Sequence, residues 1–214
     1  MRAVTVSASD VVSEPVTLGL ASEVTQVAAE SSRSGRTVVA WTTIDAGEER
    51  NERRRIYAVI GHDGRFGRPQ LVDRARHLNI AGSTTVPIRL DLAPNGRALL
   101  LWGVDRPDTD DTIDPFTEDY LVRVAEASPH GRFGTPAQLT TNGCPGDVAV
   151  QSDGTALAVW RTSDGLRASV HEAARRFRTH EVVTDKRVGE PGAVFRHGHP
   201  RVEWGTGFSE REAP

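Results

Sequence analysis

Residues 95–102, NGRALLLW, combine a tight-turn signal with an apolar run that ends in tryptophan. Asn-Gly is among the strongest hairpin signals because both residues tolerate the positive φ of a primed turn. The stretch before the turn, IRLDLA at 88–93, alternates with period two. Alternation predicts a strand with one buried face, whereas a continuous apolar run predicts a strand buried on both faces. We therefore expect a β-hairpin whose second strand lies between packed sheets.

The same hairpin pattern occurs four times in the chain of 214 residues. In each copy a glycine is followed six positions later by a tryptophan, and the copies use all four tryptophans. These copies are Gly35 to Trp41, Gly96 to Trp102, Gly154 to Trp160 and Gly198 to Trp204. A motif that places every tryptophan at one spacing indicates an internal repeat.

A second element follows each of the first three hairpins. It consists of a strand, a turn that contains Gly-Arg-Phe or a relative, and a short apolar segment. It occurs at 56–72, 121–139 and 166–183, with Phe66, Phe133 and Phe177 in equivalent places. Hairpin and second element together form a four-stranded meander of about 45 to 60 residues, a length typical of a β-propeller blade.

The two ends of the sequence match different halves of this unit. Residues 2–18 resemble its second half, and residues 192–204 supply only its first half. The sequence therefore predicts an all-β, single-domain propeller over residues 1–214, with four antiparallel blades. The blades are expected at about 24–72, 86–140 and 146–184, with a fourth made from 188–205 plus 2–18. Pairing of residues 2–8 with 200–205 would close the ring and leave no open sheet edge.

A fragment of a larger propeller is the alternative to four-bladed closure. The last copy fits the repeat least well, since Arg201 and Glu203 interrupt the apolar run that the other second strands keep.

These repeats resemble those of bacterial, especially actinobacterial, sialidase-like β-propeller proteins. Sialidases carry Asp boxes of the form Ser-x-Asp-x-Gly-x-Thr-Trp, and Ser152-Asp153-Gly154-Thr155 comes near this pattern. It lacks the spacers, and its tryptophan falls too late. The family's arginine triad and its Tyr/Glu pair have no matching positions here. The resemblance therefore implies the propeller fold, and it does not carry sialidase activity to this chain.

Bulk composition excludes several classes of protein. The hydrophobic fraction of 37% and net charge of −3 are typical of a soluble globular protein and predict neither a nucleic-acid nor a membrane partner. The lone Cys144 cannot form an intrachain disulfide. No apolar run is long enough for a signal peptide or membrane span. We expect a cytoplasmic protein as written, unless an upstream export signal is missing, and a monomer if the ring is closed.

The lengths of the connections between strands indicate where a site could lie. The connection between the second and third strands takes about 13 residues after Trp41, 17 after Trp102 and five after Trp160. The connection at 73–86 is also long. In a propeller these connections emerge on one face, and variation confined to one face is typical of a binding surface on a rigid scaffold.

The richest of these connections contains Asp108, Asp110, Asp111 and Asp114. Their carboxylates could bind calcium, although the segment lacks the glycine and terminal glutamate of an EF-hand. A solvated acidic loop is the alternative, and a glycosidase acid/base pair is a third. We predict no metal site and no cofactor, with calcium as the one candidate.

Three further groups of residues are weaker candidates. Arg53 and Arg55, beside Tyr57, could bind an anionic ligand, although neighbouring glutamates favour a self-paired charged loop. His197 and His199 form a His-x-His pair that fits a surface turn better than a metal site. Cys144 is expected in a loop as an inert thiol.

Function is predicted only at the level of class. The leading hypothesis is a non-catalytic binding propeller that engages a glycan or a protein through its long-loop face, with no catalytic residue. The alternative is a glycoside-acting hydrolase of sialidase-like ancestry. A decaying gene product without a function is a third possibility.

Overall fold

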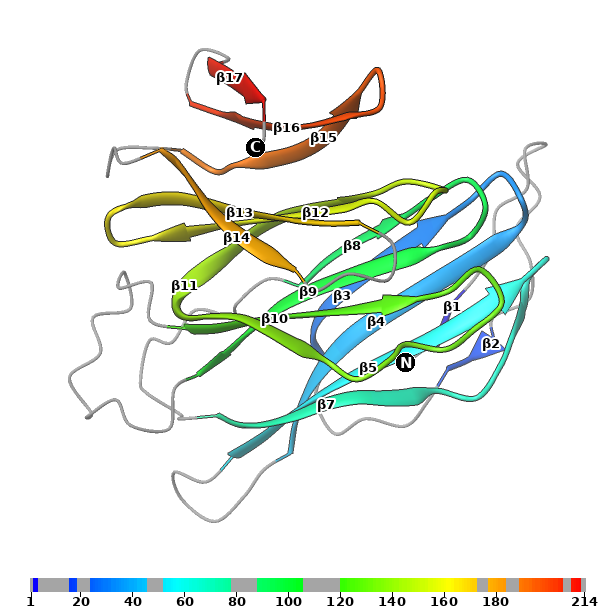
Figure 1. Cartoon of the computed structure of the whole chain (residues 1–214). Helices are drawn as coiled ribbons and strands as arrows, with labels where there is room; N and C mark the ends of the chain where they lie inside the picture. The colour runs from blue at the N-terminus through cyan, green and yellow to red at the C-terminus, as the bar shows by residue number, and fades with distance from the viewer. Residues whose placement is uncertain are drawn as a thin grey trace.

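The protein is an all-β molecule of antiparallel sheets (Figure 1). The computed structural model describes residues 2–3, 16–18, 24–45, 52–77, 88–105, 120–172, 177–183, 189–205 and 209–212. Strands and turns account for the regular structure in these ranges, which contain no helix. The predicted fold class is thus confirmed as all-β and antiparallel.

The first layer is a meander of four long strands in chain order. Its strands are β3 (Val24–Ser31), β4 (Arg36–Asp45), β5 (Glu52–His62) and β7 (Gln70–His77), with the short β6 (Arg65–Phe66) beside β5. Trp41 pairs with Tyr57 across β4 and β5, and their rings stack with centroids 5.6 Å apart. The strand order is the one expected from the repeat.

The second and third layers share one strand. The second consists of β8 (Arg89–Leu92), β9 (Ala98–Asp105), β10 (Tyr120–Ala127) and the first half of β11 (Ala137–Val150). The third consists of the second half of β11 with β12 (Ala156–Thr162), β13 (Gly165–His171) and β14 (Arg178–Val183). Cys144 lies within β11, where it pairs with Arg161 of β12. The expected loop around Cys144 was therefore wrong, because bulges in β11 let the backbone keep pairing as it passes between layers.

A fourth, shorter layer follows in the chain. It consists of β15 (Gly192–Arg196), β16 (His199–Trp204) and β17 (Ser209–Glu212). Near the other end of the chain, β1 (Arg2–Ala3) and β2 (Val16–Thr17) form a separate two-stranded ladder.

The four layers stack on one another in chain order (Figure 1). Three apolar clusters fill the three spaces between successive layers. Along β9, Leu99 and Leu101 face the third layer, whereas Leu100 and Trp102 face the first. All four side chains are fully buried. A continuous apolar run was thus the correct signal for a strand buried on both faces.

The fourth layer ends the described stack because its outer face is polar. On β16, Val202 is fully buried against the third layer, while Arg201 and Glu203 point to the opposite face. There Arg196 donates to the Glu203 carboxylate. The two charges that interrupt the repeat therefore mark a strand with one buried face, as in the terminal unit of a stacked-repeat protein.

The predicted closure of the ring was wrong for the described residues. Both edges of β16 are occupied, by β15 and by β17, and Arg2 and Ala3 pair with Thr17 and Val16 instead. Leu18 packs on Trp41, at the outer face of the first layer. The segment that forms β17 reads SERE and has no apolar alternation, so its backbone pairing leaves no trace in the hydrophobic pattern.

The repeated glycines confirm the predicted turns. Gly35, Gly96, Gly154 and Gly198 have φ values of 81°, 88°, 97° and 83°, the left-handed region that disfavours a Cβ. At Gly96 a Cβ would also lie 2.6 Å from Cδ of Arg36 in the first layer, whereas at Gly198 it would meet nothing within 4 Å.

We expect Gly96→Ala to lower the free energy of unfolding by roughly 2 kcal/mol, and Gly198→Ala by about 1 kcal/mol. The two positions share their backbone strain, so the difference measures the contact with Arg36. Urea unfolding followed by tryptophan fluorescence gives both values. Equal losses would show that the Gly96 contact has no energetic weight.

Candidate functional site

Most of the residues predicted to form a site lie outside the described part of the chain. This holds for Asp108, Asp110, Asp111 and Asp114, and for the side chain of Arg53. Calcium binding and acid/base chemistry by these carboxylates stay predictions. Arg55 is described: it is half-buried on β5, and its Nη1 donates to the Tyr57 hydroxyl at 3.5 Å. The expected charged loop at 53–55 was wrong, since β5 already begins at Glu52.

The two histidines of the His-x-His pair are both exposed, at the β15–β16 turn. His197 has a positive φ of 52°, which fits the surface turn that we predicted. The described residues contain no group of three or more metal-ligating side chains, and no helix among them is long and apolar enough to cross a membrane.

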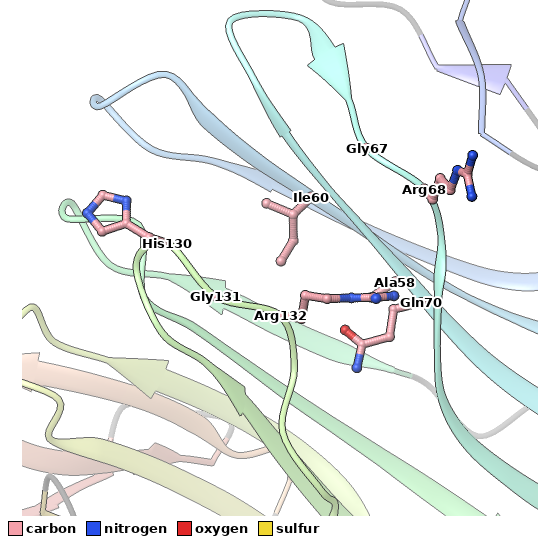
Figure 2. A pocket seen from close by; sticks show the side chains of 8 residues that line it. All are labelled: Ala58, Ile60, Gly67, Arg68, Gln70, His130, Gly131 and Arg132. Carbon is pink, nitrogen blue, oxygen red and sulfur yellow. The ribbon is translucent and has the colours of Figure 1, made fainter.

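The described residues do form a cavity of about 280 Å³ between the first two layers. It lies at the end of the stack where the tight turns are (Figures 1 and 2). Strand β5, the β6–β7 segment and the β10–β11 turn enclose it. The lining residues are Ala58, Ile60, Gly67, Arg68, Gln70, His130, Gly131 and Arg132.

Gln70 fixes the β10–β11 turn against the first layer. Its Nε2 donates to the Phe133 carbonyl at 2.7 Å, and its Oε1 accepts from the Phe133 N–H at 3.0 Å. The side-chain amide thus pairs with a backbone unit as a neighbouring strand would. Two hydrogen bonds with fixed geometry preorganise one wall of the cavity.

Arg36 stands behind the same turn and carries a buried charge. The residue is only 5% exposed, and its Nη2 donates to the Gly131 carbonyl at 2.9 Å. Burial lowers the pKa of its guanidinium, and no carboxylate among the described residues pairs with it. Its buried Nε lacks a hydrogen-bond partner in the described residues. A guanidinium keeps its proton, so the wall at Gly131 is electropositive.

Two exposed arginines stand at the rim of the cavity. Figure 2 shows Arg132 extending from the β10–β11 turn toward Ala58 and Gln70, while Arg68 projects outward from the β6–β7 segment. Neither guanidinium has a hydrogen bond or ion pair to a described residue. None of the described residues that line the cavity is a carboxylate. The cavity therefore combines an apolar floor with a cationic rim.

Sequence reasoning did not predict this cavity because its walls come from residues about seventy positions apart. A signal was present: the turn sequences HDGRFGR at 62–68 and PHGRFGT at 129–135 are near repeats. The cavity lies between these two turns, which become neighbours only when the layers stack.

Two half-buried carboxylates elsewhere have structural roles. Asp91 Oδ2 accepts the Val150 N–H at 2.7 Å, and Asp147 Oδ2 accepts the Ala193 N–H at 2.9 Å. Each aspartate thus accepts a backbone N–H from the first strand of the next layer, at an edge where no described neighbouring strand pairs. Arg89 follows the same rule by donating to the Gly146 carbonyl at 2.7 Å. These contacts set the spacing of the layers and leave the two carboxylates engaged.

Asp147 is expected to give stability a measurable pH dependence. Burial raises its pKa above the ordinary 3.8, despite backbone hydrogen bonds and Arg89, which act in the opposite direction. A folded state that binds the proton more tightly loses stability as pH rises from 3.8 through the higher folded value.

We expect Asp147→Asn, which retains the acceptor for Ala193 N–H, to flatten this decline. Urea unfolding at several pH values between about 4 and 7 measures the slope. Burial also raises the pKa of Glu30, so a smaller decline should persist. The exposed Asp153→Asn is the control, and a slope unchanged in Asp147→Asn would refute the assignment.

Comparisons with known proteins bear on the fold alone. No family model and no curated protein matches this chain. Among solved structures, a protein of unknown function from Dyadobacter fermentans is similar, with a TM-score of 0.50 and 15% sequence identity. The similarity covers 86% of this chain and 50% of that one, so this chain spans half the length of its structural neighbour. Both share an arrangement of strands.

Proposed function

We propose that this protein is a non-catalytic binding module of propeller type, which engages a glycan or a protein through the end of the stack that carries the long connections. The observation that supports it is the unequal length of equivalent connections. Residues 106–119 separate β9 from β10, whereas residues 163–164 alone separate β12 from β13. At the opposite end, the turn between the first two strands of each layer has two to five residues. One constant end and one variable end are typical of a scaffold with a binding surface.

The propeller part of the proposal is supported by the order of strands and layers. Each of the first three layers is a meander whose strands follow chain order, and successive layers pack face to face. The first strands of the layers, β3, β8, β11 and β15, contact one another in sequence. Contacts between the first strands of successive layers are also expected of neighbouring propeller blades, which supports this part of the proposal.

The hydrolase alternative has less support. A glycosidase needs two carboxyl groups about 5 to 10 Å apart in a pocket. No carboxylate lines the described cavity, and Asp91 and Asp147 are bound to backbone N–H groups.

A connection replacement tests the binding function. Residues 106–119 would be exchanged for a Gly-Ser segment of equal length, and both proteins assayed on a glycan array and in pull-downs with added candidate proteins. We expect the native chain to bind a ligand and the variant to lose it with an unchanged melting temperature. Retention of the same ligand by the variant, or no ligand for the folded native chain, would contradict the proposal.

A further inference from the structure

We propose that the cavity between the first and second layers is a second binding site, specific for a small oxyanion such as a phosphate or sulfate group. It lies at the opposite end of the stack from the long connections, so it is separate from the binding surface proposed above. The inference follows from three properties of the described residues: uncompensated charge, lack of competing carboxylates, and shape.

The first property is a buried positive charge without a counter-ion. Buried charged groups in proteins are normally paired, because an isolated charge is costly to remove from water. Arg36 is 5% exposed, and the one described hydrogen bond of its guanidinium is to the neutral carbonyl of Gly131. Gly131 itself lines the cavity. An anion in the cavity would therefore be separated from the Arg36 guanidinium only by Gly131, and it would supply the negative charge that Arg36 lacks.

The second property is the balance of charged groups at the site. Arg68 and Arg132 line it, and the described part of the chain offers neither an ion-pair partner. The acidic side chains of Asp63, in the β5–β6 turn, and of Glu126, on β10, each contact a histidine. Asp63 contacts His62 at 2.9 Å, and Glu126 contacts His171 at 2.5 Å. Among the described residues, no carboxylate that lines the cavity therefore competes with an incoming anion.

The third property is the shape of the cavity and the chemistry of its floor. A guanidinium presents parallel N–H groups that match the oxygens of phosphate or sulfate in a bidentate fashion. Arg132 extends over the floor formed by Ala58 and Ile60 (Figure 2). The volume of about 280 Å³ holds an oxyanion together with a small organic group, which the two apolar residues would contact.

Isothermal titration with inorganic phosphate, inorganic sulfate and phenyl phosphate tests the site, with sodium chloride at matched ionic strength as reference. We expect saturable binding of at least one of these probes. Arg132→Gln should weaken it by about tenfold or more, and Arg68→Gln by a smaller factor. Both residues are exposed, so neither variant should unfold the protein.

Arg65→Gln is the matched control. Arg65 holds the same place in its Gly-Arg-Phe turn as Arg132, is exposed, and does not line the cavity. Its substitution should leave affinity unchanged. The Gly-Ser replacement of residues 106–119 should also leave it unchanged, which separates this site from the proposed binding surface.

The probes also distinguish the source of the anion. Tighter binding of phenyl phosphate than of inorganic phosphate assigns an ester whose organic part contacts Ala58 and Ile60. Equal affinity assigns a free oxyanion. No binding beyond the chloride reference, or equal binding by native protein and an Arg68→Gln/Arg132→Gln double variant, overturns the proposal.

Discussion

Replacing Asp73 with alanine is expected to lower the free energy of unfolding by about 3 kcal/mol. The Asp73 side chain is 11% exposed and accepts from Trp102 Nε1 at 2.9 Å. It also accepts from Arg123 Nη1 at 2.9 and 3.1 Å. Alanine would leave a buried indole N–H and a mostly buried guanidinium without their acceptor. Chemical denaturation followed by fluorescence measures the loss.

Asp73→Asn provides the comparison. Its amide oxygen can still accept from Trp102 Nε1, but it has no charge for Arg123. We expect it to lose roughly half as much stability as the alanine variant. If both variants unfold like the native protein, the contact has no role in joining the first two layers.

The third layer repeats this arrangement without the carboxylate. Trp160 lies opposite Arg167, as Trp102 lies opposite Arg123. Thr140 occupies the position in the second layer that Asp73 occupies in the first. Each of the two lies two strands away from the residue that follows its own layer's tryptophan, and the residue between them pairs with both.

Trp160 Nε1 is buried and has no hydrogen-bond partner among the described residues. We accordingly expect Thr140→Asp to raise the free energy of unfolding by roughly 1 kcal/mol. The gain should be absent in a Trp160→Phe background.

The second large effect is expected on β16, where Val202→Asp should separate the fourth layer from the stack. Val202 is fully buried against Leu157 and Val159 of the third layer. A carboxylate there would be buried without a partner, at a cost of about 4 kcal/mol. Apart from this face, the fourth layer is held by polar contacts to the rest of the stack, such as that of Ala193 N–H with Asp147. We therefore expect local opening at moderate temperature before the other layers unfold.

Limited proteolysis tests this separation by the appearance of cleavage within residues 189–205. The control is Glu203→Val, one position along the same strand but on the outer face, which should not increase cleavage. Similar cleavage in both variants would contradict the assignment of one buried and one exposed face to β16.

The sequence was most informative where burial and turn chemistry act locally. Gly96 and Leu99 to Trp102 predicted a left-handed turn and a strand buried on both faces, and both were found. These properties depend on residues next to one another in the chain. The strand order within each of the first three layers followed from repeating that local unit.

What escaped prediction depends on contacts between distant segments. Strand β17 pairs through its backbone and has polar side chains, so no apolar pattern reveals it. Asp73 becomes a bridging residue only because Trp102 lies on the next layer. The cavity likewise requires two turns that stacking alone brings together. Spacing in the sequence says nothing about which layer covers which.

The shared strand β11 has a mechanical consequence. Residues 137–150 belong to both the second and the third layer, so these two layers are joined by continuous, hydrogen-bonded backbone. The first and fourth layers attach mainly through side-chain packing. Under a pulling force applied at the two ends of the chain, the outer layers should peel away first, in small steps. The portion from β8 to β14 should then unfold last, in a single large increase in extension, because β11 holds its two layers together.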